Sequence, residues 1–347
     1  MSTALTSVSI DHVEFYVQDA AASAADLVRR YGFAELARSH AGDSIAVGQA
    51  DVALVMTQGP TDDHPASAYV HAHGDGVANI ALRTTDARAA WAHAVAGGAR
   101  PIAEPTAHNN GCVTATIAAF GDVVHTFVQR AAGHDADRYP PALIRVADAP
   151  VRTPAGLGRL DHFAVCLPAG ELEPTVKFYS SALSFAKIFE ERIVVGDQAM
   201  NSEVVQSASG AVTLTLIEPD TNRDPGQIDE FVKAHGGPGV QHVAMTSDDI
   251  VRSVTALREH GVAFLNTPDA YYRQLPGRLT LAAHNVDELR ELDILADRDD
   301  DGQLFQIFTQ STHPRRTFFF EVIERLGART FGSGNIKALY EAVERTR

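Results

Sequence analysis

The sequence has few cysteines, few basic relative to acidic residues, and no long apolar run. Its two cysteines, Cys112 and Cys166, stand in apolar, strand-like surroundings, so we expect buried free thiols in a cytoplasmic protein. With 29 basic and 44 acidic residues the net charge is −15, which argues against nucleic acid or an anionic membrane as a partner. No window approaches ~18 consecutive apolar residues, and the N-terminus lacks the pattern of a secretory leader. We therefore expect no membrane span.

The remaining composition is that of a globular protein with two domains. Hydrophobic residues make up 45% and charged residues 21% of the 347-residue chain, as is typical of folded proteins. A chain of this length suits two domains, each with its own core. Residues 131–158 are rich in Pro, Ala and Asp and show little periodicity. We place a boundary near residue 150, which gives domains at 1–150 and 151–347.

The two halves repeat one another. IDHVEFYV at 10–17 matches LDHFAVCL at 160–167, and GVANIAL at 76–82 matches GVQHVAM at 239–245. In each half a strand with period-2 hydrophobicity leads into an amphipathic helix, then a strand–turn–strand segment, a further strand and helix, and a closing strand. The closing strands are GDVVHTFVQR at 121–130 and GQLFQIFTQ at 302–310. We expect an α+β fold in which helices cover one face of each sheet.

Three residues on separate strands of the second half have the chemistry of a metal site. His162 and His242 occupy related positions in the sheet, and Glu321 stands among Phe, Val and Ile in TFFFEVIER. An unpaired carboxylate there would cost several kcal/mol. Two imidazoles and one carboxylate form the facial arrangement that suits non-haem Fe(II). A strand histidine also fits a hydrogen-bonded core residue, so spacing alone leaves both interpretations open.

The first half lacks this set of ligands. His12 matches His162, but Asn79 stands where the second half has His242, and no counterpart of Glu321 follows the closing strand. Asn is a poor ligand for Fe(II). We therefore expect a metal in the second half alone, with the first half as a metal-free structural partner.

Other histidines are expected to be unrelated to a metal. His125, which we align with Gln306 of the repeat, is expected to be a packed residue. His71 and His73 precede the turn HGDG and are expected in a solvated loop, as is His313 before a proline.

These motifs resemble the 4-hydroxyphenylpyruvate dioxygenase family, within the vicinal-oxygen-chelate superfamily. The likeness covers nearly the whole chain and is strongest from residue 160 onward. It implies tandem βαβββ modules that form two open barrel-like halves, with Fe(II) held by His162, His242 and Glu321 and a C-terminal helix that closes the site. The motifs that carry it are LDHFAVC, VVGDQAMNSEVVQSASG, DPGQIDEF, GVQHVAM, GQLFQIFTQ, TFFFEVIER and FGSGNIKALYEAVER.

The resemblance also implies 4-hydroxyphenylpyruvate and O₂ as substrates. In the family the α-keto acid chelates Fe(II), CO₂ leaves, and the remaining oxygen atom oxidises the hydroxyphenylacetate. Gln306 is similar to the residue that hydrogen-bonds near the metal and the keto acid, and Phe319, two residues before Glu321, should face the same side of its strand. The implied substrate contacts are Ser202, Thr215, Ile217, Gln227, Gln306, Phe308, Phe319, Phe331, Ile336 and Tyr340.

Two positions depart from the pattern of the ring-hydroxylating family members. Those members typically have Asn in the strand before the EP turn and Phe in a C-terminal GNF motif, whereas this chain has Ile217 and Ile336. Both changes resemble the members that oxidise the benzylic carbon and form 4-hydroxymandelate, which feeds hydroxyphenylglycine into peptide antibiotics. Replacing an amide by an alkyl group removes a hydrogen-bond partner for the substrate. We therefore expect 4-hydroxymandelate as the product.

Two other functions stay open at this point. The first is ring hydroxylation to homogentisate in tyrosine breakdown. The second is metal-free ligand binding by a protein built from the same modules, such as one that sequesters a drug. The presence of His162, His242 and Glu321 together argues against the second. The sequence leaves the oligomeric state and the stereochemistry of the product undetermined.

Overall fold

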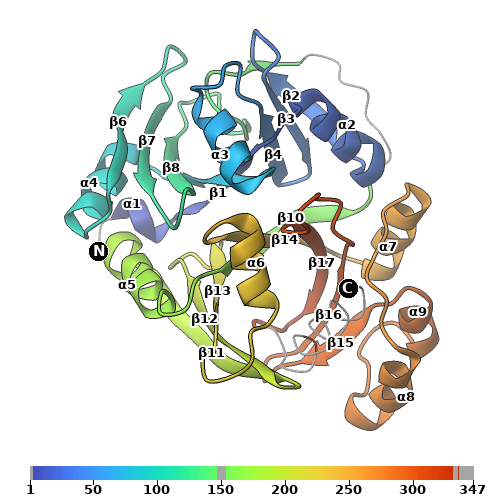
Figure 1. Cartoon of the computed structure of the whole chain (residues 1–347). Helices are drawn as coiled ribbons and strands as arrows, with labels where there is room; N and C mark the ends of the chain where they lie inside the picture. Colours follow the sequence, from blue (N-terminus) through green and yellow to red (C-terminus); the bar gives the residue numbers. More distant parts are fainter. Residues whose placement is uncertain (1–2, 147–153, 331–334, 336–347) are drawn as a thin grey trace.

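The computed structural model describes residues 3–146, 154–330 and 335. They form two curled sheets, one from each half of the chain (Figure 1). The sheets lie on either side of the expected boundary near residue 150, and the division into two domains itself stays a prediction. No helix in the described residues has the length and apolar character needed to cross a membrane. Both cysteines are free and buried, as expected.

Each half consists of two βαβββ modules. In the first half the modules are β1 (Ser9–Tyr16), α2 (Ala20–Tyr31), β2 (Ala34–Arg38), β3 (Ser44–Gln49) and β4 (Val52–Thr57), and then β5 (Gly76–Arg83), α4 (Ala87–Ala96), β6 (Pro101–Ala107), β7 (Val113–Ala118) and β8 (Val124–Gln129). The elements outside the modules are α1 (Thr3–Thr6), α3 (Pro65–His73) and β9 (Ile144–Arg145).

The second half repeats this order. Its first module is β10 (Leu157–Cys166), α5 (Leu172–Leu183), β11 (Ala186–Val195), β12 (Gln198–Gln206) and β13 (Thr213–Pro219). After α6 (Gln227–His235) the second module is β14 (Gly239–Ser247), α7 (Ile250–Glu259), β15 (Leu295–Arg298), β16 (Gln303–Phe308) and β17 (Phe319–Leu326), with α8 (Asp269–Arg278) and α9 (Val286–Glu291) inserted after α7.

Apart from β9 at the edge of the first sheet, the strand order is the same in both sheets when the second is followed in the opposite direction. The orders are β6-β7-β8-β5-β1-β4-β3-β2-β9 and β11-β12-β13-β10-β14-β17-β16-β15. The two modules of a half meet at an antiparallel pair, β1 with β5 and β10 with β14. Each of these central strands pairs in parallel on its other side with the last strand of its own module: β4, β8, β13 and β17. The module centre of each half is therefore built from four neighbouring strands.

The module helices begin at similar local signals. Asp19, Asp86 and Asp249 precede α2, α4 and α7, and the side chain of each accepts a hydrogen bond from a backbone N–H in the first turn. Such a cap satisfies a donor that the helix itself leaves unpaired, and it contributes about 1 kcal/mol.

Side chains alternate between two faces of the second sheet. Val243 and Met245 of β14 belong to a hydrophobic core that runs through both halves, whereas His242 and Ala244 point to the other face. Helices α5 and α7 pack on the core face, in agreement with the expected one-sided cover. Helix α6 differs from that expectation, because its Phe231 packs against side chains of β10 and β13 on the face that carries His242, called the inner face below.

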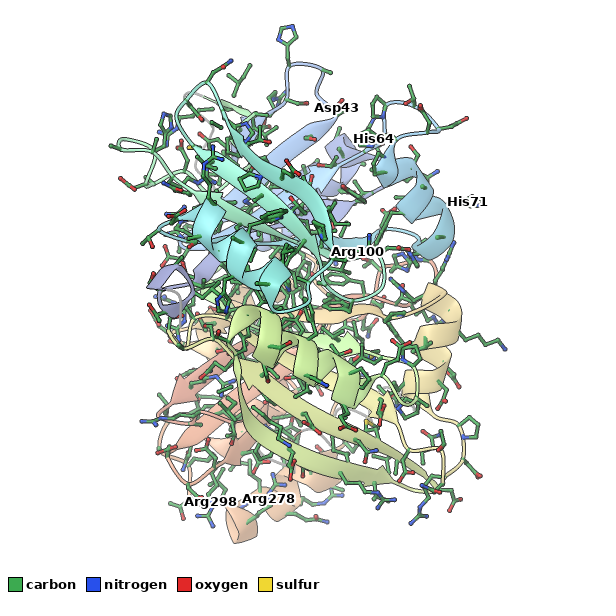
Figure 2. The ribbon with its side chains drawn as sticks, turned by 90° about the vertical axis from the view of Figure 1, so that its left-hand side faces the viewer. Asp43, His64, His71, Arg100, Arg278 and Arg298 are labelled. Atoms are coloured by element: carbon green, nitrogen blue, oxygen red, sulfur yellow. The ribbon has the colours of Figure 1, made fainter. Side chains whose placement is uncertain are left out.

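Helix α3 replaces the solvated loop expected around His71 and His73. His71 projects from the surface (Figure 2). His73 is buried, its ring stacks on that of His235 at 4.4 Å between centroids, and its Nε2 lies 2.9 Å from a carboxylate oxygen of Asp122. The expectation was wrong for His73 because the second half covers this end of α3.

The loop between β16 and β17 packs on the first half. Phe318 meets the ring of Phe15 edge-on at 5.1 Å, and Phe320 meets Tyr31 at 5.2 Å. Arg315 donates to the backbone carbonyl of Ala72 at the end of α3 over 2.6 Å. The strand that follows this loop, β17, therefore starts from a position fixed by the other half.

His125 is a second link between the halves. It is fully buried, and its ring nitrogens lie 2.9 Å from the Ile80 carbonyl oxygen and 2.9 Å from the Tyr179 hydroxyl of α5. Burial lowers the pKa of His125 to about 4, although the hydrogen bond to Ile80 opposes this shift. The ring is therefore neutral at pH 7, with Nδ1–H donating to Ile80 and Nε2 accepting from Tyr179.

The buried His125 predicts acid sensitivity of the fold. Between pH 6.5 and 4, His125 binds a proton in the unfolded chain but not in the folded chain. The free energy of unfolding therefore decreases as the pH falls, by up to about 1.4 kcal/mol per pH unit. In His125→Gln this part of the pH dependence should disappear, as measured by urea unfolding at several pH values. His71→Gln, at an exposed histidine, is the matched control. A pH slope that is unchanged in His125→Gln contradicts the prediction.

Candidate metal centre

Three neighbouring strands bring His162, His242 and Glu321 together. They come from β10, β14 and β17, and one ligand atom from each lies within 4.8 Å of the other two. All three side chains are buried on the inner face of the second sheet. Among the residues that the structure describes, this is the one such group of three His, Cys, Asp or Glu side chains.

The strand register explains why the three side chains meet. Ala164 lies opposite His242 across the antiparallel β10–β14 pair, and Ala244 lies opposite Glu321 across the parallel β14–β17 pair. His162, two residues from Ala164 on its strand, thus faces the same side. Two alanines between the ligands leave the space that the larger groups occupy.

The atoms at the centre fit a divalent metal ion. Nε2 of His162 and Nε2 of His242 each lie 3.3 Å from Oε2 of Glu321. The other carboxylate oxygen of Glu321 is buried and has no hydrogen-bond partner. Buried polar atoms are nearly always paired, and an ion is one explanation for an exception. Two imidazole nitrogens and a carboxylate oxygen would hold the ion and leave one side of it open.

The three side chains and their surroundings shift one another's pKa values. Burial by itself would raise the pKa of Glu321, but the neighbouring His162 outweighs it and the pKa is lowered. Burial would likewise lower the pKa of His162, yet the Glu321 and Asp161 carboxylates raise it to about 9. Burial lowers the pKa of His242. A bound cation would take the place of the proton on His162.

The corresponding place in the first half has a different composition. His12 is kept, but Asn79 uses its amide within the protein: it donates to a carboxylate oxygen of Glu14 at 3.3 Å and accepts the N–H of Thr126 at 3.2 Å. In the strand register Thr126 takes the place that Glu321 has in the second half. In the first half, Thr126 thus replaces the carboxylate of Glu321, and the hydrogen-bonded amide of Asn79 replaces the imidazole of His242.

This register corrects one correspondence expected from the sequence. Strand β8 is the equivalent of β17, whereas β16 corresponds to β7. His125 therefore matches Phe320 and not Gln306. The expectation that His125 is packed is confirmed, since it is fully buried. The two closing segments look alike in sequence because both are apolar strands of similar length, which does not determine their place in the sheet.

The expected substrate contacts that the structure describes lie around the same inner face. Phe319 stacks on the ring of His242 at 4.9 Å, and Phe308 meets that ring edge-on at 5.8 Å. All except the half-buried Phe319 are buried: Ser202 on β12, Thr215 and Ile217 on β13, Gln227 at the start of α6, and Gln306 and Phe308 on β16. Phe331, Ile336 and Tyr340 lie outside the described residues.

Two of these polar residues have atoms available to a ligand. Oγ1 of Thr215 and Oε1 of Gln306 are buried without a hydrogen-bond partner. Ile217 differs, because it packs in an apolar cluster with Met200 and Phe231 and lies opposite Ser202 on the neighbouring strand. The inner face thus has unpaired polar atoms at Thr215 and Gln306 and an apolar surface at Ile217.

Asp161 and Arg325 also belong to this site, although neither was predicted from the sequence. Asp161 lies 2.8 Å from Nδ1 of His162, and Arg325 donates two hydrogen bonds to Asp161. A usable signal was present: the dipeptide Asp-His opens both halves, and an arginine stands at the end of both β8 and β17.

The fold and the site define the class of this protein. Residues 159–307 match the model of the Glyoxalase/Bleomycin resistance protein/Dioxygenase superfamily. Residues 3–140 match the model of the N-terminal part of hydroxyphenylpyruvate dioxygenase. The arrangement of paired βαβββ modules is the vicinal-oxygen-chelate fold.

Whole-chain relatives narrow the class. A 4-hydroxyphenylpyruvate dioxygenase of Dictyostelium discoideum is 35% identical over 96% of this chain and 97% of its own length. A probable 4-hydroxyphenylpyruvate dioxygenase 2 of Aspergillus fumigatus is also 35% identical, over 97% and 93%. A mutant of 4-hydroxymandelate synthase from Streptomyces coelicolor has a solved structure with a TM-score of 0.89 and 42% identity, over 98% of this chain and 99% of that one. The chain belongs to the 4-hydroxyphenylpyruvate dioxygenase family.

The geometry predicts which side chains would hold a metal ion. His162→Ala, His242→Ala and Glu321→Gln should each weaken Fe(II) binding by roughly 100-fold, because two ligands hold the ion poorly. Anaerobic titration of the metal-free protein measures the affinity and the stoichiometry. His12→Ala, at the matching position of the first half, should bind one Fe(II) as tightly as the parent. Full loading of His242→Ala would overturn the ligand assignment.

Proposed function

We propose that this protein is an Fe(II)-dependent 4-hydroxymandelate synthase. The reaction consumes 4-hydroxyphenylpyruvate and O₂ and gives 4-hydroxymandelate and CO₂. Family membership makes it an enzyme of the dioxygenase class that uses a non-haem metal. The convergence of His162, His242 and Glu321 supports the oxidative chemistry, and the apolar side chain of Ile217 supports the choice of product.

Iron is proposed because of the donor set. Two neutral imidazoles and one carboxylate with an open face are typical of non-haem Fe(II) sites. When bound, Fe(II) would supply the activation of O₂ and bind the α-keto acid. The protein contributes the orientation of the ligands, and the buried inner face keeps competing water away from the reacting groups.

The residues of the inner face would bind and orient the substrate. Phe308 and Phe319 flank His242 and offer flat surfaces for the hydroxyphenyl ring. The hydroxyl of Thr215 and the amide of Gln306 have buried oxygens without a partner, and a polar ligand would satisfy them. Ser202 and Gln227 are proposed as further polar contacts, and Phe331 and Tyr340 as contacts from the C-terminal segment.

The choice between the two family products depends on which carbon of the substrate the pocket presents for oxidation. Ile217 fills its place with an alkyl group packed against Met200 and Phe231, where the ring-hydroxylating members typically have Asn. An amide there could hold the phenol or an oxidised ring by a hydrogen bond, and an isoleucine has no such group. Without that hydrogen bond, we propose, the pocket presents the benzylic carbon and not the ring for oxidation.

The product of the unmodified protein tests the proposal directly. Iron-loaded protein with 4-hydroxyphenylpyruvate and O₂ should release 4-hydroxymandelate and CO₂ in equal amounts. Homogentisate is an isomer of 4-hydroxymandelate, so the products must be separated by chromatography against standards. Homogentisate as the main product would establish the ring-hydroxylating alternative. A protein that binds the keto acid but no iron would establish the alternative of a binding protein.

Ile217 and Ile336 are predicted to decide the product together. The double change Ile217→Asn and Ile336→Phe should shift product toward homogentisate or released hydroxyphenylacetate, at the expense of 4-hydroxymandelate. The two effects should be non-additive because both side chains are proposed to touch one substrate. Single-turnover reactions analysed by chromatography measure the ratio, and Fe(II) affinity should stay unchanged.

A matched control for this double change is Thr57→Asn. Thr57 has the same place in the first half that Ile217 has in the second, beside the strand that carries His12. This control should form only the parental product. A double variant that makes only 4-hydroxymandelate at the parental rate would show that other residues determine the product.

A further inference from the structure

We propose that Asp161 is a positioning residue for the metal ligand His162, and that Arg325 holds Asp161 in place for this task. The inference rests on the proposed metal site and is independent of which product is formed. It concerns two residues that are neither candidate ligands nor expected substrate contacts.

A β-bulge makes the contact between Asp161 and His162 possible. Neighbouring residues of a regular strand point to opposite faces, so Asp161 and His162 should not meet. In the pairing of β10 with β14, Leu160 lies opposite Met245 and His162 lies opposite Ala244, so two steps on β10 match one step on β14. The extra residue re-aims the chain, as bulges beside functional sites often do. Oδ1 of Asp161 then lies 2.8 Å from Nδ1 of His162.

This contact fixes which nitrogen of His162 faces the metal site. A carboxylate paired with arginine can only accept hydrogen bonds, so Nδ1 of His162 must donate to it. With Nδ1–H fixed in this way, Nε2 is the nitrogen that gives up its proton to a metal, and it lies 3.3 Å from Oε2 of Glu321. A second partner of this kind orients a metal-bound histidine and strengthens it as a ligand. Nδ1 of His242 has no such partner among the described residues.

Arg325 ties this contact to the strand that carries the third ligand. It lies four residues after Glu321 on β17 and therefore on the same face. Its Nε and Nη2 donate to the two oxygens of Asp161 over 2.9 and 2.8 Å, and its Nη1 donates to the carbonyl of Thr330 over 2.7 Å. The pair is mostly buried. Strand β17 thus places one ligand directly and orients a second through Arg325 and Asp161.

The first half contains the same three groups without the metal ligands around them. Nδ1 of His12 lies 2.7 Å from Oδ1 of Asp11, and Arg130 donates to the other oxygen of Asp11 over 3.0 Å. A register shift between Ile10 and His12 marks the same bulge. Asp11 also accepts a hydrogen bond from Arg83 over 3.0 Å, so the two halves are compared by metal binding and not by stability alone. A role in metal binding should appear in the second half alone.

The test compares Asp161→Asn with Asp11→Asn. Metal-free protein is titrated with Co(II) under anaerobic conditions without substrate, and the visible absorption of bound Co(II) is recorded, while thermal unfolding of the metal-free protein reports stability. We expect Asp161→Asn to bind Co(II) about 10- to 100-fold more weakly and with an altered spectrum. Asp11→Asn should match the parent in both, even where the two variants lose similar stability.

Several outcomes overturn the proposal. Parental affinity and spectrum in Asp161→Asn, or equal weakening in Asp11→Asn, would leave the arrangement a structural role only. If Asp161→Asn does not fold, the pair Asp161→Asn with Arg325→Gln removes both buried charges together, and Asp11→Asn with Arg130→Gln is its control. A parent without a stoichiometric Co(II) site would overturn the metal site and this inference together, whereas a wrong product would leave this inference intact.

Discussion

A single carboxylate in an apolar strand is the constraint on which the second half depends. Glu321 lies between Phe320 and Val322 of the core and is almost completely buried. A buried charge of this kind is unfavourable unless it is paired. The strand order that sets β14 between β10 and β17 brings His162 and His242 to it, and a metal ion would complete the pairing. The inner face is therefore organised around a charge that the apolar core face could not accommodate.

The two halves show how one fold accommodates this constraint or avoids it. Where the second half has Glu321, the first half has Thr126, and its Asn79 is bonded to Glu14 and to the backbone. The same sheet thus has hydrogen bonds within the protein where the second half has a candidate metal site. The fold supplies the positions, and the side chains at three of them decide whether these positions hold a metal.

Much of the fold and the three candidate ligands could be predicted because the chain repeats itself. Matching strands place His162 and His242 in one sheet, and a carboxylate among phenylalanines marks Glu321. The sequence could not predict the bulge at Asp161, since period-2 patterning assigns Asp161 and His162 to opposite faces. It also misassigned His73 and the strand of the second half that is equivalent to β8, because contacts between the halves and the order of strands are set by tertiary packing. The substrate side chains follow from family resemblance, not from spacing.

The packing of the β16–β17 loop on the first half has a consequence for inheritance. Phe15 and Tyr31 of the first half contact Phe318 and Phe320, which flank the start of the strand that carries Glu321. A copy of a duplicated domain that has no catalytic groups is ordinarily free to drift or to be deleted. Under the proposal that only the second half is catalytic, selection on it also acts on the first half, because Phe15 and Tyr31 pack against the start of the strand that carries Glu321. The first half would then be retained because it supports the strand that carries a candidate ligand of the second half.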